Sequence, residues 1–209
     1  MTASAEYSRR FLALGDSYTI GEGVALHERW PAQLARRLEA RGISIDQPVV
    51  IAQTGWTTDE LAAAMDAVTF APPYALVTLL IGVNDQYRGR DVAGYRGAFA
   101  GLLERAITLA GGHANRVVVV SIPDWGVTGF AHAQARDPTQ IATAINAFNA
   151  SAAHIAGTLG AAFVDITGVS RDAGDDQAML VGDRLHPTAA QYALWTQSIL
   201  PAAADALAS

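Results

Sequence analysis

The chain has 209 residues, of which 51% are hydrophobic and 16% are charged. This balance excludes a disordered chain, and the length allows one domain to bury a core without disulfides. The formal net charge of −6 argues against a nucleic-acid partner, because phosphate binding needs clustered Lys and Arg. The chain has no cysteine, which excludes thiol catalysis, disulfides and thiolate metal sites.

The sequence shows no apolar stretch of signal-peptide length before its first motif and no run long enough to span a membrane. We therefore expect a cytoplasmic protein without stable membrane insertion. The oligomeric state stays open at this point.

Short apolar runs alternate with segments of helical periodicity along the whole chain. The runs are continuous rather than alternating, which is typical of parallel strands buried on both faces. In chain order we predict a strand over 10–14, a helix over 30–38, a strand over 48–52, a helix starting near Thr58, a strand over 75–81, a helix over 95–109, a strand over 116–122, a helix over 141–159, a strand over 162–166 and a helix over 192–199. Right-handed crossovers then give an α/β fold: a three-layer α/β/α sandwich around a five-stranded parallel sheet, in one domain over residues 1–209.

Ligands of open parallel sheets bind beyond the carboxyl ends of the strands, so the loops after the strands are the first place to look for a site. The first strand is followed by Gly15-Asp16-Ser17. A serine hydroxyl becomes a nucleophile when a base removes its proton, and Gly15 would permit a tight strand-to-helix turn that exposes it. The alternative is that Ser17 caps a helix.

Asp183 and His186 come shortly before the last predicted helix. Their spacing of three residues allows the carboxylate to hold one imidazole nitrogen while the other acts as a base. Pro187 places His186 just before the helix begins. The alternative is that Asp183 caps a turn and His186 only packs.

Gly55 and Asn84 follow the second and third predicted strands. Together with the N–H of Ser17 they are candidate donors of an oxyanion hole, which stabilises charge that develops in a transition state. Asn and Gly are also common in turns, which is the alternative. The four loops meet at one edge of the predicted sheet, and this conjunction favours a catalytic site.

At these residues the sequence resembles the SGNH, or GDSL-type, hydrolase superfamily, which is named for its Ser, Gly, Asn and His blocks. The matching segments are FLALGDSYTIGEG, IAQTGWTTDEL, LLIGVNDQY and GDRLHPT, in the expected order over residues 11–188. The resemblance implies a flavodoxin-like sandwich with strand order 2-1-3-4-5 and a triad of Ser17, His186 and Asp183 that needs no metal or cofactor. Many members have glycine where this chain has Arg184, which would place a cation near the site.

We therefore expect a serine hydrolase that cleaves a small-molecule carboxylic ester or thioester through an acyl-enzyme. The alternatives are an acyltransferase or deacetylase acting on a sugar or another alcohol, and a flavodoxin-like binding module without catalysis. Trp125, Tyr87 and Arg88 are expected to line the substrate pocket, with simple loop packing as the alternative. The chain has no long insertion for a lid, so we expect short acyl chains to be preferred.

Overall fold

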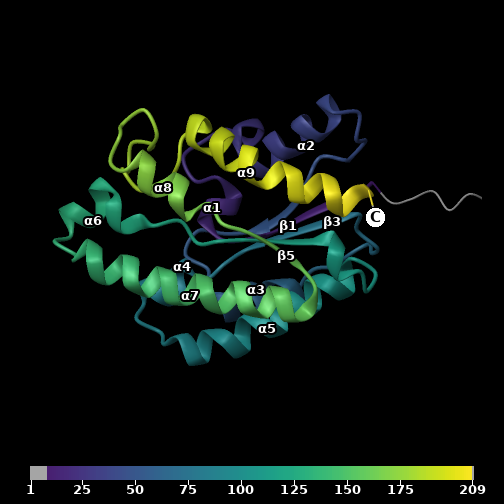
Figure 1. Ribbon diagram of the computed structural model, residues 1–209, viewed down its shortest axis with the longest axis horizontal. Helices are drawn as coiled ribbons and strands as arrows, with labels where there is room; N and C mark the ends of the chain where they lie inside the picture. The colour runs from purple at the N-terminus through teal and green to yellow at the C-terminus, as the bar shows by residue number, and fades with distance from the viewer. Residues whose placement is uncertain (1–8, 209) are drawn as a thin grey trace, which may run out of the picture.

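The computed structural model describes residues 9–208. All five of its strands are parallel and form one sheet in the order β2-β1-β3-β4-β5 (Figure 1). The strands are β1 (Phe11–Gly15), β2 (Val49–Ala52), β3 (Leu76–Leu80), β4 (Val117–Val120) and β5 (Ala162–Val164). This confirms the predicted sheet and its strand order, with each observed strand overlapping a predicted one.

Long helices cover both faces of the sheet and form the two outer layers (Figure 1). One layer contains α2 (Trp30–Ala40) and α9 (Ala189–Ala208), which pack on each other. The other layer contains α3 (Thr58–Asp66), α5 (Val92–Leu109) and α7 (Pro138–Leu159). The three-layer sandwich expected from the alternating apolar runs is therefore confirmed.

The core lies along the central strands. Every residue of β1, β3 and β4 is buried, whereas the edge strands β2 and β5 are partly exposed. Burial on both faces explains why the central strands have continuous apolar runs instead of an alternating pattern.

Short helices follow the carboxyl ends of four strands. The sequence predicts loops at these places, because a segment of one or two turns is too short to show a helical period. These elements are α1 (Ser17–Ile20), α4 (Val83–Tyr87), the 3-10 helix η3 (Trp125–Val127) with α6 (Gly129–Ala133), and α8 (Thr167–Ala173). Two further 3-10 helices, η1 (Leu26–Glu28) and η2 (Ala114–Arg116), complete the elements of the described chain.

α3 starts at Thr58, which confirms the predicted start. Its N-cap is Thr57, and the capping box closes through Glu60, whose Oε2 accepts the backbone N–H of Thr57 at 2.9 Å. Thr58 instead donates its N–H and its hydroxyl to the buried carboxylate of Asp85, at 3.0 Å and 2.8 Å. This contact ties α3 to α4.

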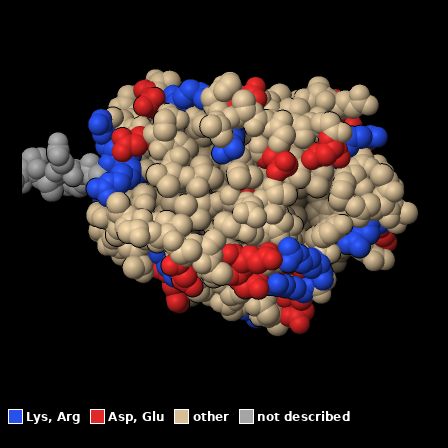
Figure 2. All heavy atoms as spheres, turned by 180° about the vertical axis from the view of Figure 1, so that it is seen from behind, with Lys and Arg blue, Asp and Glu red and all other residues tan. Residues whose placement is uncertain are grey.

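The surface carries charges of both signs. On the face shown in Figure 2, acidic and basic side chains are interspersed on a mostly uncharged surface. Between residues 9 and 208, no helix combines the length and the apolar character needed to cross a bilayer. Residues 1–8, on which the expected absence of an export signal partly depends, lie outside the described residues.

Candidate active site

The carboxyl edge of the sheet contains a cavity of about 180 Å³. Its lining contains six of the site residues predicted from the sequence: Ser17, Gly55, Asn84, Tyr87, Trp125 and His186. They come from four different strand-end loops and from the segment before α9, as the rule for open parallel sheets requires.

Ser17 is the first residue of α1 and follows β1 after one residue. The N-cap of α1 is Asp16, whose Oδ1 accepts the N–H of Tyr18 at 3.0 Å. Ser17 is therefore not the helix cap, and its side chain belongs to the cavity wall. The serine is only 5% exposed, so a substrate must enter the cavity to reach it.

Asp183 holds the imidazole of His186. The Nδ1 of His186 lies 2.6 Å from Asp183 Oδ2, while Asp183 Oδ1 accepts the backbone N–H groups of Leu185 and His186 at 2.8 Å and 3.0 Å. The carboxylate therefore caps the turn and orients the ring at the same time, and the two roles considered from the sequence coexist. A ring that donates from Nδ1 keeps Nε2 as an acceptor.

The environment of Asp183 favours its charged form. Partial burial opposes ionisation, but the hydrogen bonds from the His186 ring and from the two backbone N–H groups outweigh it and lower the pKa of Asp183. An anionic Asp183 stabilises a protonated imidazole, which is what a general base needs after it has accepted a proton.

Gly55 and Asn84 are held together by hydrogen bonds between α4 and the loop after β2. Asn84 Nδ2 donates to the carbonyl of Trp56 at 2.9 Å, and its amide group has a second N–H. Gly55 has a φ of +87°, a left-handed conformation that glycine adopts without strain. Arg88 donates to the Gly55 carbonyl at 2.7 Å and to Glu60 at 3.2 Å. The position of Arg88 therefore suits bracing of this loop.

Aromatic and aliphatic side chains form the rest of the cavity wall. The ring of Tyr87 lies 5.3 Å from that of Trp125 and 6.4 Å from that of Phe130. Sequence reasoning missed Phe130, because it lies on the short helix α6, for which the sequence predicts a loop. It also missed four other lining residues: Tyr18, Thr54, Val83 and Leu185. All four are chain neighbours of predicted site residues, and this adjacency was the available signal.

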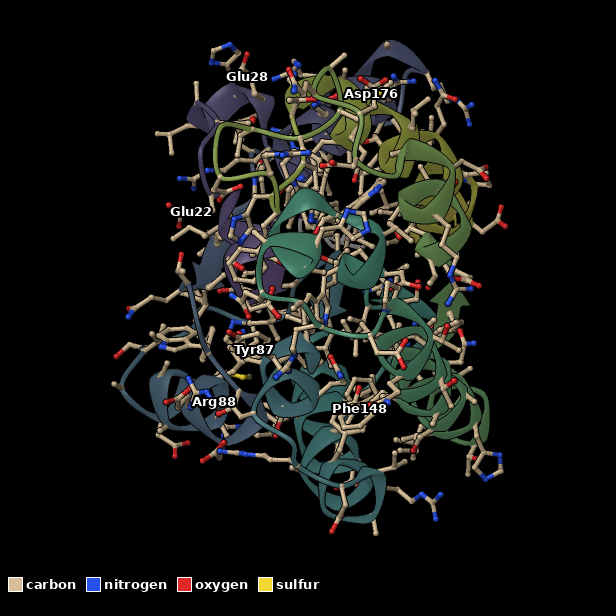
Figure 3. All side chains as sticks on the ribbon, turned by 90° about the vertical axis from the view of Figure 1, so that its left-hand side faces the viewer. Glu22, Glu28, Tyr87, Arg88, Phe148 and Asp176 are labelled. Carbon is tan, nitrogen blue, oxygen red and sulfur yellow. The ribbon has the colours of Figure 1, made fainter. Side chains whose placement is uncertain are left out.

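Two charged side chains, Glu22 and Arg88, hydrogen-bond to the loop after β2. Glu22, from the loop after α1, accepts a hydrogen bond from the hydroxyl of Thr54, which lines the cavity. Figure 3 shows Glu22 above Tyr87 and Arg88 on the side of the molecule that it views. The loop after β2 is therefore held on one side by Glu22 and on the other by Arg88.

Arg184 forms an ion pair with Asp175, so its charge is balanced nearby. Its φ of +56° is unusual for a residue other than glycine, and its carbonyl accepts the N–H of Phe130 at 3.1 Å. The backbone of Arg184 thus links the segment that carries Asp183 and His186 to α6. Among residues 9–208, no cluster of three or more His, Asp or Glu side chains is arranged to hold a metal ion.

Asp16 directly precedes Ser17 in the chain and is fully buried. Its Oδ2 has no hydrogen-bond partner among the described residues. Burial raises the pKa of Asp16 to about 8, and the nearby Asp85 adds to the effect. The carboxyl is therefore neutral in the folded protein at pH 7.

This burial makes the stability of the protein depend on pH. An unfolded Asp ionises near pH 4, whereas folded Asp16 keeps its proton up to a pH of about 8. Between these values the folded state binds more protons than the unfolded state, so stability falls as pH rises, by up to about 1.4 kcal/mol per pH unit. Asp16→Asn cannot titrate, and we expect it to gain stability over wild type from pH 5 to pH 8. Urea unfolding at both pH values measures this, and a difference that does not change with pH would contradict it.

A parallel α/β sandwich that brings Ser, His and Asp together at its carboxyl edge is typical of enzymes that hydrolyse esters. The GDSL-like lipase/acylhydrolase family matches residues 13–194, most of the chain, and the chain belongs to this family. It is thus a carboxylic ester hydrolase.

Solved structures share the fold over nearly the whole chain. TesA is 22% identical with a TM-score of 0.72, covering 92% of this chain and 97% of that chain. The psychrotrophic esterase EstA from Pseudoalteromonas sp. is 18% identical with a TM-score of 0.73, covering 97% and 100%. The acetylxylan esterase Axe2 from Geobacillus stearothermophilus is 18% identical with a TM-score of 0.72, covering 93% and 94%. No curated protein matches the chain.

Proposed function

We propose that the protein hydrolyses short-chain carboxylic esters, with Ser17 as nucleophile, His186 as general base and Asp183 as the partner that orients the ring. The observation that carries this proposal is the 2.6 Å contact between His186 Nδ1 and Asp183 Oδ2, with His186 and Ser17 on the wall of one cavity. A serine, an imidazole and a carboxylate in this relation form the arrangement that activates a hydroxyl.

The reaction proceeds in two halves. His186 Nε2 takes the proton of the Ser17 hydroxyl while Oγ attacks the acyl carbonyl, and Asp183 stabilises the imidazolium. The imidazolium then gives this proton to the alcohol oxygen as the ester C–O bond breaks, which leaves the acyl group on Ser17. In the second half, a water molecule attacks the acyl carbonyl while His186 takes its proton. The imidazolium then returns the proton to Ser17 Oγ as the acyl–serine bond breaks, which releases the acid and restores the serine.

Three donors are available for the oxyanion of the tetrahedral intermediate: the backbone N–H groups of Ser17 and Gly55 and the side-chain amide of Asn84. The bond from Asn84 to Trp56 and the bond from Arg88 to Gly55 fix two of these donors before substrate arrives. Donors that are already in place need no reorganisation when the charge appears, so they act mainly on the transition state.

The size of the cavity supports short acyl groups. Its volume of about 180 Å³ is close to that of an engineered cavity of about 150 Å³ that holds benzene, a molecule of six carbons. The aromatic rings of Tyr87, Trp125 and Phe130 form part of its wall. An acyl chain of two to six carbons fills this space, whereas a longer chain leaves methylenes outside it.

An acetyl ester of a sugar is a second candidate substrate, and the similarity in fold to the acetylxylan esterase Axe2 favours it. The same residues would also serve an acyltransferase that delivers the acyl group to an alcohol. Adding an acceptor alcohol to the assay separates the two, because a transferase forms a new ester while a hydrolase releases the free acid.

Replacing the nucleophile is the direct test of the triad. We expect Ser17→Ala to abolish covalent labelling by a fluorophosphonate and turnover of 4-nitrophenyl acetate, because Ser17 is the only serine among the described residues that line the cavity with His186. Mass spectrometry of labelled peptides and circular dichroism measure labelling and folding. Ser198→Ala, on α9, is the control, and we expect it to retain both the labelling and the turnover. Labelling of another residue in Ser17→Ala would refute the assignment.

Asn84→Ala tests the oxyanion donors. We expect kcat to fall by roughly 10²–10³ with little change in KM, because the amide acts on charge that is present only in the transition state. Steady-state kinetics with 4-nitrophenyl butyrate measures both constants. A change confined to KM would make Asn84 a residue for ground-state binding instead.

A series of 4-nitrophenyl esters tests the acyl preference. We expect kcat/KM to be highest for acyl groups of two to six carbons, because further methylenes stay in water and gain less than the ~0.8 kcal/mol of full burial. A steady rise of kcat/KM through ten or more carbons would instead support a lipase with a longer acyl site.

A further inference from the structure

A second cavity, of about 630 Å³, lies behind the aromatic wall of the catalytic cavity. Tyr87 and Trp125 line the catalytic cavity, while Gln86 and Arg136 line the second one. The Nε1 of Trp125 donates to Gln86 Oε1 at 2.8 Å. Because residues that face the two cavities touch each other, the wall between them is one layer of side chains thick.

Arg136 covers this wall from the side of the second cavity. Its guanidinium carbon lies 5.2 Å from the centroid of the Tyr87 ring and 5.5 Å from that of Trp125. Its Nη2 also donates to the carbonyl of Tyr87 at 3.4 Å. Cations at these distances are attracted by the faces of aromatic rings, so one side chain holds both rings of the wall.

Tyr87 is the exposed part of the wall. It is 39% exposed, whereas Trp125 is 2% exposed and donates a hydrogen bond to Gln86. The hydroxyl of Tyr87 is 3.3 Å from Gln134 Oε1, to which it donates. The segment after α6 therefore holds Tyr87 at its hydroxyl, at its ring face and at its carbonyl.

Three apolar residues of α7, Ile141, Ala144 and Phe148, line one part of the second cavity. The remaining lining includes the polar and charged side chains of Gln86, Arg90, Arg136, Asp137 and Gln140. Figure 3 labels Tyr87, from the wall, and Phe148, from the lining of the second cavity. A longer acyl chain gains burial only if the ring of Tyr87 moves aside.

We propose that Arg136 determines acyl-chain length by clamping Tyr87 against Trp125, which closes the catalytic cavity toward the second cavity. This proposal rests on the proposed function, since it concerns the acyl side of the same cavity. Removing the guanidinium frees the Tyr87 ring and joins the two cavities. Each methylene that then becomes buried raises kcat/KM by a factor of up to about four.

The test compares Arg136→Ala with wild type on 4-nitrophenyl esters of two to twelve acyl carbons. We expect the ratio of kcat/KM for decanoate to that for butyrate to rise at least tenfold in Arg136→Ala. Arg136→Lys keeps a cation near the rings and should show a smaller rise. Arg105→Ala is the matched control: Arg105 lies on α5, its substitution breaks an ion pair with Asp66 of α3, and the variant should keep the wild-type profile.

An unchanged ratio in Arg136→Ala, or an equal loss at every chain length, would overturn the proposal. Binding of the neutral ketone 2-dodecanone, measured by calorimetry, gives the same test without turnover. We expect at least tenfold tighter binding by Arg136→Ala, and an unchanged Kd would also overturn the clamp. Failure of the proposed function shows separately, as a wild-type enzyme that turns over none of the esters or prefers the longest.

Discussion

The backbone of Gly15 runs so close to its neighbours that a Cβ there would lie 2.5 Å from the carbonyl oxygen of Leu80 and closer still to the hydroxyl oxygen of Thr19. Contacts this short do not occur between packed atoms, so glycine lets β1 end against β3 and turn directly into α1. Ser17 then stands between the ends of β2 and β3, because β1 lies between these strands. The loops that carry Gly55 and Asn84 flank it for the same reason.

Much of this arrangement can be predicted from the sequence, because it depends on local signals combined with topology. Continuous apolar runs mark the strands, and the rule that parallel strand ends meet at one edge is enough to bring Ser17, Gly55 and Asn84 together there. Phe130 and Arg136 cannot be found in this way. Their contacts depend on how α6 and the turn after it pack against α4. Ala135 in this turn has a φ of +51°, and no sequence periodicity predicts this packing.

The surroundings of Asp16 and Asp183, the carboxyls next to Ser17 and His186, shift the pKa values of these two groups in opposite directions. Asp183 receives three hydrogen bonds, and its pKa is lowered, whereas Asp16 receives one from Tyr18, and burial raises its pKa to about 8. A neutral Asp16 adds no negative charge next to Ser17, whose N–H is a proposed oxyanion donor. In the proposed mechanism the anion of the site is Asp183, which lies against the imidazole of His186.

Chemistry and substrate choice depend on different kinds of contact. The groups proposed for catalysis are held by hydrogen bonds of 2.6–3.0 Å to buried or half-buried partners, such as those of Asp183 and Asn84. At the proposed acyl side, an exposed tyrosine lies under a guanidinium, a weaker contact that a single substitution removes. The backbone bond that links the two sides, from Phe130 to Arg184, does not involve the Tyr87 ring. Under the proposed clamp, changes in the segment after α6 are therefore expected to alter which acyl chains fit while the contact between His186 and Asp183 keeps its geometry.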